Sequence, residues 1–180
     1  SFIHLHTASA FSLKYGTTQP VDLVERASQL EAPALALTDR DGLLGAIRFT
    51  KACLQYGIAP IIGVNLAINL QNDLQKSRIV DDKKLPRLTL IAGSDGGWRN
   101  LVRLMSSLNL STGAPVLTLD FLERFSQYTQ NLYVLHGLDS PLAPAIAAHR
   151  NDSALAIFNK TRDFFKAHAI ECVSHLAKGD

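Results

Sequence analysis

The chain has 180 residues, 47% of them hydrophobic, which is typical of one domain with a sizeable buried core. A formal net charge of +2, without a basic stripe interleaved with aromatic residues, argues against a dedicated nucleic-acid surface. The sequence has no run of 18 apolar residues and no signal peptide, so we expect a cytoplasmic protein that does not enter a membrane.

Both cysteines are expected to be buried thiols, since Cys53 lies in a helical pattern and Cys172 in an apolar strand. A pair of cysteines fits a reducing compartment better than a disulfide scaffold. The chain opens inside an apolar run without an initiating Met and ends without a closing element. Both ends are typical of a piece of a longer protein, truncated at its C-terminus.

The first half of the chain alternates apolar strands with amphipathic helices. We expect a strand over 2–5, a helix over 20–31, a strand over 34–37, a helix over 43–56, and a strand from 58 to 62 that continues with alternating residues to 70. Pro20 is favoured at the first position of the helix over 20–31. Gly57 is favoured as the left-handed residue directly after the helix over 43–56. The polar residues 71–84 predict a loop.

The second half continues the alternation. We expect a strand over 88–92, a helix through 101–108, a Ser/Gly/Pro linker over 109–117, a short helix capped by Thr118, a strand over 131–135, helices over 140–149 and 153–168, and a last strand over 169–173. Apolar strands separated by helices predict a parallel α/β architecture, either a barrel or a doubly wound sheet. Residues 93–97 lack the lysine and the spacing of a phosphate-binding loop.

Polar residues with metal-binding or catalytic chemistry collect where the expected strands end, which is where parallel α/β folds place their sites. These residues are His4, His6, Asp39, Arg40, Asp41, Asn65, Ser94, Asp95, His136 and His175. A His-x-His pair on a strand points both imidazoles to one face, which can begin a metal site, although solvated loop histidines give the same pattern. His149 and His168 fall on expected helices and are predicted to be solvated surface residues.

Several ordered segments resemble the polymerase and histidinol phosphatase (PHP) domain, specifically that of bacterial C-family DNA polymerase III α subunits. These segments are 4–16 (HLHTASAFSLKYG), 34–45 (ALALTDRDGLLG), 57–63 (GIAPIIG) and 88–106 (LTLIAGSDGGWRNLVRLMS). Residues 169–180 (AIECVSHLAKGD) resemble the error-prone α subunit of actinobacteria. The resemblance identifies residues 1–180 as a PHP domain at the N-terminus of a larger polymerase.

The resemblance implies a distorted (β/α)7 barrel whose rim, in active members, binds up to three metal ions and hydrolyses phosphoesters. The resemblance also implies that in some replicases this domain acts as a proofreading 3′–5′ exonuclease. The parent chain would be a DNA-directed DNA polymerase of replication or error-prone repair, with its polymerase carboxylates far downstream. The implied partners are the rest of that chain, a replisome or repair protein, and DNA through the parent enzyme.

The sequence departs from the family at the positions that the resemblance assigns to metal ligands. His4, His6, Asp39, His136 and His175 are the vestigial metal positions, and Ala8, Tyr15, Arg40 and Asn65 stand at four lost ligand positions. Arg40 is the most consequential, because a guanidinium about 4 Å from a divalent ion would cost roughly 8 kcal/mol at an effective dielectric of 20. Arginine does not lose its proton to avoid that cost.

We therefore expect a metal-free, catalytically inactive module that is structural or docks partners, without catalytic residues or cofactor. Arg40 is expected to pair with Asp39 or Asp41, or else to point into solvent. The alternative is a metal-dependent phosphoesterase or 3′–5′ exonuclease that uses Mn, Zn or Mg on a reduced site of His4, His6, Asp39, His136 and His175. A free-standing small-molecule phosphatase is disfavoured by the polymerase-like residues 93–106.

Overall fold

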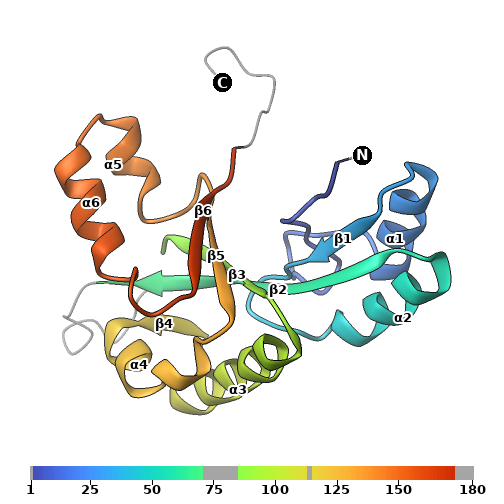
Figure 1. Cartoon of the computed structure of the whole chain (residues 1–180), viewed down its shortest axis with the longest axis horizontal. Helices are drawn as coiled ribbons and strands as arrows, with labels where there is room; N and C mark the ends of the chain where they lie inside the picture. Colours follow the sequence, from blue (N-terminus) through green and yellow to red (C-terminus); the bar gives the residue numbers. More distant parts are fainter. Residues whose placement is uncertain (1, 71–84, 113–114, 173–180) are drawn as a thin grey trace.

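The computed structural model describes residues 2–70, 85–112 and 115–172 (Figure 1). The elements in chain order are α1 (Pro20–Gln29), β1 (Ala34–Leu37), α2 (Ala46–Tyr56), β2 (Ala59–Asn69), β3 (Arg87–Ala92), α3 (Asp95–Thr112), β4 (Val116–Thr118), α4 (Leu119–Arg124), the 3-10 turn η2 (Ser126–Tyr128), β5 (Leu132–His136), α5 (Ala143–Ala147), α6 (Asn151–Asn159) and β6 (Ala167–Ile170). No helix within these ranges has both the length and the apolar content needed to span a bilayer.

The described strands form a six-stranded sheet in the order β1-β2-β3-β5-β6, with β4 beside the far end of β2. This confirms the α/β class, and the sheet is consistent with a distorted PHP barrel. The expectation of parallel strands throughout is wrong for β3, which runs antiparallel to both β2 and β5. The sequence could not reveal this reversal, because a strand buried on both faces is an apolar run whichever way it points.

The N-terminal segment occupies the position of a further strand beside β1 without being a regular one. The amide of Ala36 donates to the carbonyl of His4 at 3.0 Å, and the amide of Thr38 donates to the carbonyl of Thr7 at 2.8 Å. The expected strand over 2–5 therefore lies where a strand should, but its side chains are exposed, with Phe2 73% accessible.

The helices α1 and α2 pack against one another beside β1 and β2 (Figure 1). α2 starts three residues later than expected and buries Ala46, Phe49, Ala52 and Cys53. Burial raises the pKa of the Cys53 thiol to about 11, in agreement with an inert core cysteine. Two large apolar residues of this helix, Ile47 and Leu54, are exposed.

The second half contains the larger boundary errors. α3 runs to residue 112 and β4 follows at 116–118, where the sequence predicted a linker over 109–117. α6 ends at residue 159 instead of 168, because the following residues turn back and bury Phe165. β6 then pairs with β5 two residues earlier than expected, which leaves Cys172 exposed and not buried as predicted.

Two clusters of buried apolar side chains hold the elements together. The larger lies between β2, β3, β5 and the helices α3 and α4, and the smaller lies between α1, α2 and β1. Ile62 on β2 contacts both clusters. The long strand β2 thus connects the two parts of the core.

Replacement of Gly57 by alanine should lower the free energy of unfolding by about 1–2 kcal/mol, because this residue ends α2 at φ 69° in the left-handed region. An added Cβ would meet no heavy atom within 4 Å, so the cost comes from the backbone alone. Urea denaturation measures it. Asparagine tolerates this conformation better, so Gly57→Asn should cost less, and equal losses for the two variants would contradict the account.

Candidate functional site

A cavity of about 360 Å³ opens where β1, β5 and β6 end, and we call it the rim cavity. It is lined by His6, Ala8, Tyr15, Arg40, Leu138, Asp139 and Glu171. These residues come from the N-terminal segment, from the end of β1, from the loop after β5 and from the end of β6. Four of the positions singled out in the sequence therefore meet at one cavity.

The carboxylate of Asp39 folds the N-terminal segment onto the end of β1. Asp39 is 1% exposed and accepts hydrogen bonds from the Ser9 amide at 2.6 Å, the Ser9 hydroxyl at 2.8 Å and the Ser12 hydroxyl at 2.7 Å. The Ser12 hydroxyl also accepts from the Arg40 amide at 2.9 Å. The two serines were not predicted as site residues, although both lie within the first resemblance motif.

The His6 side chain contacts Glu171 across the cavity by a hydrogen bond. Its Nδ1 lies 2.8 Å from Oε2 of Glu171, and its Nε2 lies 3.5 Å from the Thr89 hydroxyl. The Glu171 amide donates to the carbonyl of His136 at 2.9 Å, which fixes the glutamate at the end of β6. Glu171 was not predicted as a site residue. The strand expected over 169–173 would have Glu171 in its middle, whereas β6 ends at Ile170 and Glu171 directly follows it.

Arg40 lies in the cavity between an aromatic ring and a carboxylate. Its guanidinium carbon is 3.6 Å from the centroid of the Tyr15 ring, and its Nη2 is 3.5 Å from Oδ2 of Asp139. The predicted pairing with Asp39 or Asp41 is wrong. Asp39 is held by serines, and Asp41 is paired with Arg87. Arg40 and Tyr15, which stand at two lost ligand positions, thus contact each other.

Asn65, at a third lost ligand position, belongs to a buried polar group centred on Arg87. The Nε of Arg87 donates to the side-chain oxygen of Asn65, and its Nη2 lies 2.6 Å from Asp41 and 2.8 Å from the Asn65 carbonyl. The Asn65 amide nitrogen donates to Thr89 at 2.9 Å. Donors and acceptors of this amide are therefore engaged within the protein.

The reversed direction of β3 explains why Arg87 was missed and why Ser94 and Asp95 were misplaced. In a parallel sheet residues 94 and 95 would follow the carboxyl end of their strand and reach the rim. Because β3 is antiparallel, its first residue, Arg87, lies level with Ala67 of β2, and its last residues lie at the opposite edge. The prediction that Ser94 and Asp95 belong to the rim is therefore wrong.

His136 pairs with His168 and not with the histidine of the N-terminal segment. His136 is 4% exposed, and its Nε2 lies 3.0 Å from Nδ1 of His168, whose Nε2 faces the carbonyl of Arg162 at 3.3 Å. A carbonyl only accepts, so His168 carries its proton on Nε2 and His136 donates to it from Nε2. The Nδ1 of His136 is then a buried lone pair without a partner among the described atoms.

Burial and the neighbouring imidazole lower the pKa of His136 to about 4, and burial also lowers the pKa of His168. The prediction that His168 is a solvated helical residue is wrong, since it lies in β6 and contacts Phe158 and Phe165. His149 is exposed, as expected.

Of the two remaining vestigial positions, His4 does not line the cavity. His4 is exposed and packs its ring edge-on to Phe2, with 4.8 Å between the centroids. His175 lies outside the described residues. Across residues 2–70, 85–112 and 115–172, no group of three or more His, Cys, Asp or Glu side chains is arranged to hold a metal ion.

Comparison of the chain with known proteins shows its family. The family model described as PHP domain matches residues 4–175. The chain belongs to the PHP domain family. It is 39% identical over 105 residues to the DNA polymerase III subunit alpha of Buchnera aphidicola, which is 58% of this chain and 8% of that protein. It is 34% identical over 113 residues to the error-prone DNA polymerase of Mycobacterium tuberculosis, which is 63% of this chain and 10% of that protein.

The PHP chain therefore spans about a tenth of the length of these polymerases. Among solved structures it is similar to an amidohydrolase from Chromobacterium violaceum with bound sulfate and no metal. That similarity has a TM-score of 0.44 and 23% identity, and it covers 60% of this chain and 33% of the other.

The candidate ligands among the described side chains of this PHP domain are engaged with other groups of the protein. His6 is bound to Glu171, Asp39 is saturated by serine donors, and His136 is bound to His168. The guanidinium of Arg40 adds a fixed positive charge to the same cavity. The donor set is thus divided among separate internal contacts.

Acidification should destabilise the protein through His136. Its pKa of about 4 lies below the usual 6.5, so the unfolded chain binds a proton that the folded chain does not between these values. The His136 contribution is therefore complete above about pH 6.5 and is lost as pH falls toward 4, at no more than about 1.4 kcal/mol per pH unit. Urea titrations at several pH values should show a flatter profile for His136→Gln. The exposed His149→Gln variant is the control, and equal profiles for wild type and His136→Gln would refute this assignment.

The contact between Arg40 and Tyr15 should appear as a coupling energy. A double-mutant cycle with Arg40→Met and Tyr15→Leu should give about 0.5–1 kcal/mol in the free energy of unfolding, the range for a cation over an exposed ring. Arg48 and Phe11 provide the matched control, because their cation-to-centroid distance is 5.6 Å instead of 3.6 Å. If the coupling energy is no larger than that of the control pair, Arg40 and Tyr15 contribute to stability independently, and the predicted interaction is wrong.

Proposed function

We propose that this chain is the N-terminal PHP domain of a DNA-directed DNA polymerase of replication or error-prone repair, metal-free and catalytically inactive, serving as a structural or partner-docking module. The similarity to DNA polymerase III subunit alpha and to error-prone DNA polymerase supports the first part. Because the chain spans about a tenth of those proteins, polymerase chemistry would belong to the remainder of such a chain.

The position of Arg40 is the observation that carries the metal-free part of the proposal. Its guanidinium is held in the rim cavity by Tyr15 and Asp139. A divalent ion about 4 Å away would be repelled by roughly 8 kcal/mol at an effective dielectric of 20, before any ligand contributes. The nearest compensating carboxylates are already engaged, Asp139 with Arg40 and Glu171 with His6.

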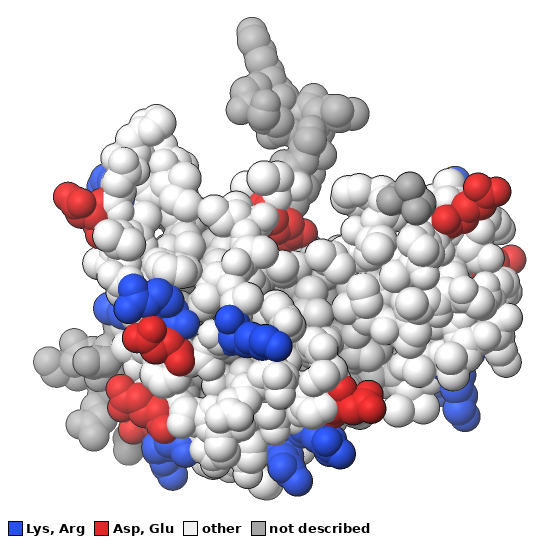
Figure 2. All heavy atoms as spheres, viewed as in Figure 1, with Lys and Arg blue, Asp and Glu red and all other residues white. Residues whose placement is uncertain are grey.

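The partners of such a module would be the rest of the polymerase chain and a replisome or repair protein, with DNA reached through the parent enzyme. On the face drawn in Figure 2, acidic and basic side chains are interspersed. Phosphate backbones are held by clustered Lys and Arg, and the described side chains on this face form no such cluster of one sign. The surface on this side therefore supports contacts with protein more than contacts with DNA.

Metal analysis tests the proposal directly. After incubation with Mn²⁺, Zn²⁺ or Mg²⁺ and desalting, elemental analysis of the chain should find only substoichiometric metal. The same protein should release no nitrophenol from a phosphodiester analogue and should not shorten a 3′-labelled oligonucleotide. His6→Ala is the matched control, since it removes the one histidine that lines the cavity and should change neither result.

The opposite outcomes favour the reduced-site enzyme. A tightly held ion that is lost in His6→Ala, or hydrolysis that needs added metal and disappears in that variant, would overturn the metal-free proposal. In the same assays Arg40→His should bind metal no more weakly than wild type, because it removes the repelling charge and restores an imidazole.

A further inference from the structure

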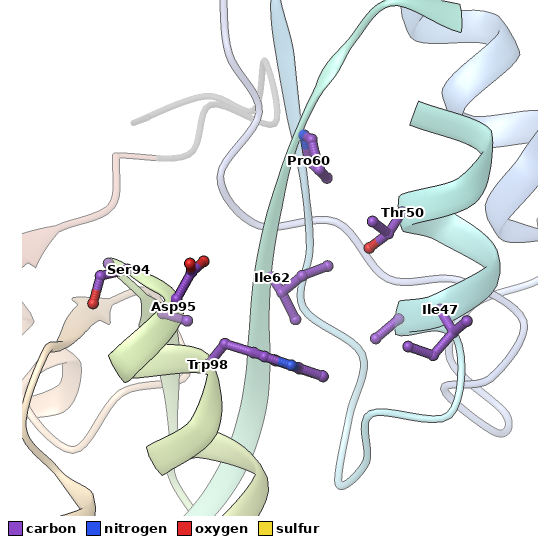
Figure 3. Close-up of a pocket in the computed structure, with 10 residues that line it drawn as sticks. Ile47, Thr50, Pro60, Ile62, Ser94, Asp95 and Trp98 are labelled. Atoms are coloured by element: carbon purple, nitrogen blue, oxygen red, sulfur yellow. The ribbon is translucent and has the colours of Figure 1, made fainter. Parts of the chain in front are cut away.

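An apolar groove with a volume of about 430 Å³ lies between α2 and α3, away from the rim (Figure 3). We call it the α2–α3 groove. Ile47 and Thr50 of α2 form one wall, Trp98 of α3 forms the other, and Pro60 and Ile62 of β2 lie between them. The remaining lining residues are Ala46, Ala92, Gly93, Ser94 and Asp95.

The groove exists because the first part of β2 is not covered on this side. Residues 59–62 of β2 are exposed or half-buried, whereas residues 63–68 are buried. In Figure 1, α2 and α3 both lie below β2, α2 beneath its first part and α3 farther along, and no described helix or strand lies between the two helices. In α/β folds the element that covers a strand in such a position is a helix.

The wall formed by α2 has the pattern of a helix-packing surface that faces solvent. On α2, Ile47 is 61% exposed and Leu54 is 70% exposed. The two residues are seven positions apart, about two helical turns, and therefore lie on one face of α2. Of the two, Ile47 lines the groove, so the apolar wall continues onto the solvent-facing side of the helix.

The groove carries one charge, the carboxylate of Asp95. Asp95 and Trp98 are three residues apart on α3 and therefore lie on the same side of that helix. In Figure 3 the Trp98 side chain points across the groove toward Ile47, and Asp95 lies behind it toward Ser94. A Lys or Arg side chain entering here would lay its stem on the indole and bring its charged end to the carboxylate.

We propose that the α2–α3 groove binds an amphipathic helix of a partner polypeptide. The apolar face of that helix packs on Ile47, Ile62 and Trp98, and one of its basic residues pairs with Asp95. A second copy of this chain fits less well, because the described residues that line its groove include no Lys or Arg to pair with Asp95. This inference rests on the docking role proposed above, and it specifies the surface and the kind of partner.

The single tryptophan of the chain makes the groove directly observable, because Trp98 lines it. The experiment displays helical peptides of about 16 residues, long enough to hold some helix in water, on an Ala/Glu/Lys frame whose one face is randomised at i, i+3, i+4 and i+7. Peptides are selected on the full chain and counter-selected on Ile47→Asp. A selected peptide is then synthesised and titrated while the emission of Trp98 is followed.

The proposal expects enriched peptides with aliphatic residues on one face and a Lys or Arg at one end, and a blue shift of Trp98 emission on binding. Ile47→Asp should abolish binding, and Asp95→Asn should weaken it a few-fold, as loss of an exposed ion pair does. Leu110→Asp is the matched control, because Leu110 is 88% exposed on the far part of α3 and should leave affinity unchanged. Circular dichroism checks that each variant is folded.

Three results would overturn the proposal: no enrichment over the unselected library, peptides that bind Ile47→Asp as well as wild type, or a dimer in sedimentation that Ile47→Asp dissociates. The last result would identify a second copy as the occupant. The metal content of the rim is measured separately, so loss of the groove proposal and loss of the metal-free proposal are distinguishable.

Discussion

The buried carboxylate of Asp39 is the constraint on which the rim depends. A carboxylate that is 1% exposed is tolerated only when its oxygens are hydrogen-bonded, and here the donors come from Ser9 and Ser12. The anion therefore holds residues 9–12 against the end of β1. Gly45 is part of the same arrangement, since a Cβ there would lie 2.9 Å from a carboxylate oxygen of Asp39. The positions of His6 and Tyr15 on either side follow from this attachment.

The replaced ligand positions form a set of mutually compatible contacts. Arg40 and Asp139 are 31% and 41% exposed, so their ion pair contributes little to stability by itself. Arg87 is only 8% exposed and is bound to Asp41 and Asn65, so removal of either partner would leave a buried cation short of acceptors. The stronger restraint on this edge thus comes from Arg87, while Arg40 contributes mainly by the charge that it places in the cavity.

The sequence predicted correctly the helices and strands whose apolar pattern is unbroken. It did not predict the bounds of elements that depend on pairing between strands far apart in the chain. α1 and β1 were found within two residues of their bounds, because Pro20 and Pro33 punctuate them. β4 is three residues long and exists only because β2 pairs with it, so no local pattern could reveal it. The end of α6 was missed because Phe164 and Phe165 continue a helical spacing that tertiary contacts override.

The same limit applies to the site. His6 lines the rim cavity and Asp39 is buried just after β1, because the N-terminal segment lies alongside β1 and β1 is parallel to β2. Their assignment as metal positions stays a prediction. The partner of Arg40 was predicted from nearness in sequence, but Asp39 turns inward to the serines and Asp139 arrives from the loop after β5. Glu171 could be recognised only once the register between β5 and β6 was known.

The reversed strand β3 gives the molecule two chemically different edges. It brings the basic Arg87 to the rim, where with Arg40 it balances Asp41 and Asp139. It carries Asp95 to the opposite edge, beside the uncovered start of β2 and the exposed Ile47. A ligand at the rim would have to break internal ion pairs, whereas a partner at the groove would bury apolar side chains already in water. The docking that we propose is therefore favoured at the groove, because burial of its exposed apolar side chains is favourable.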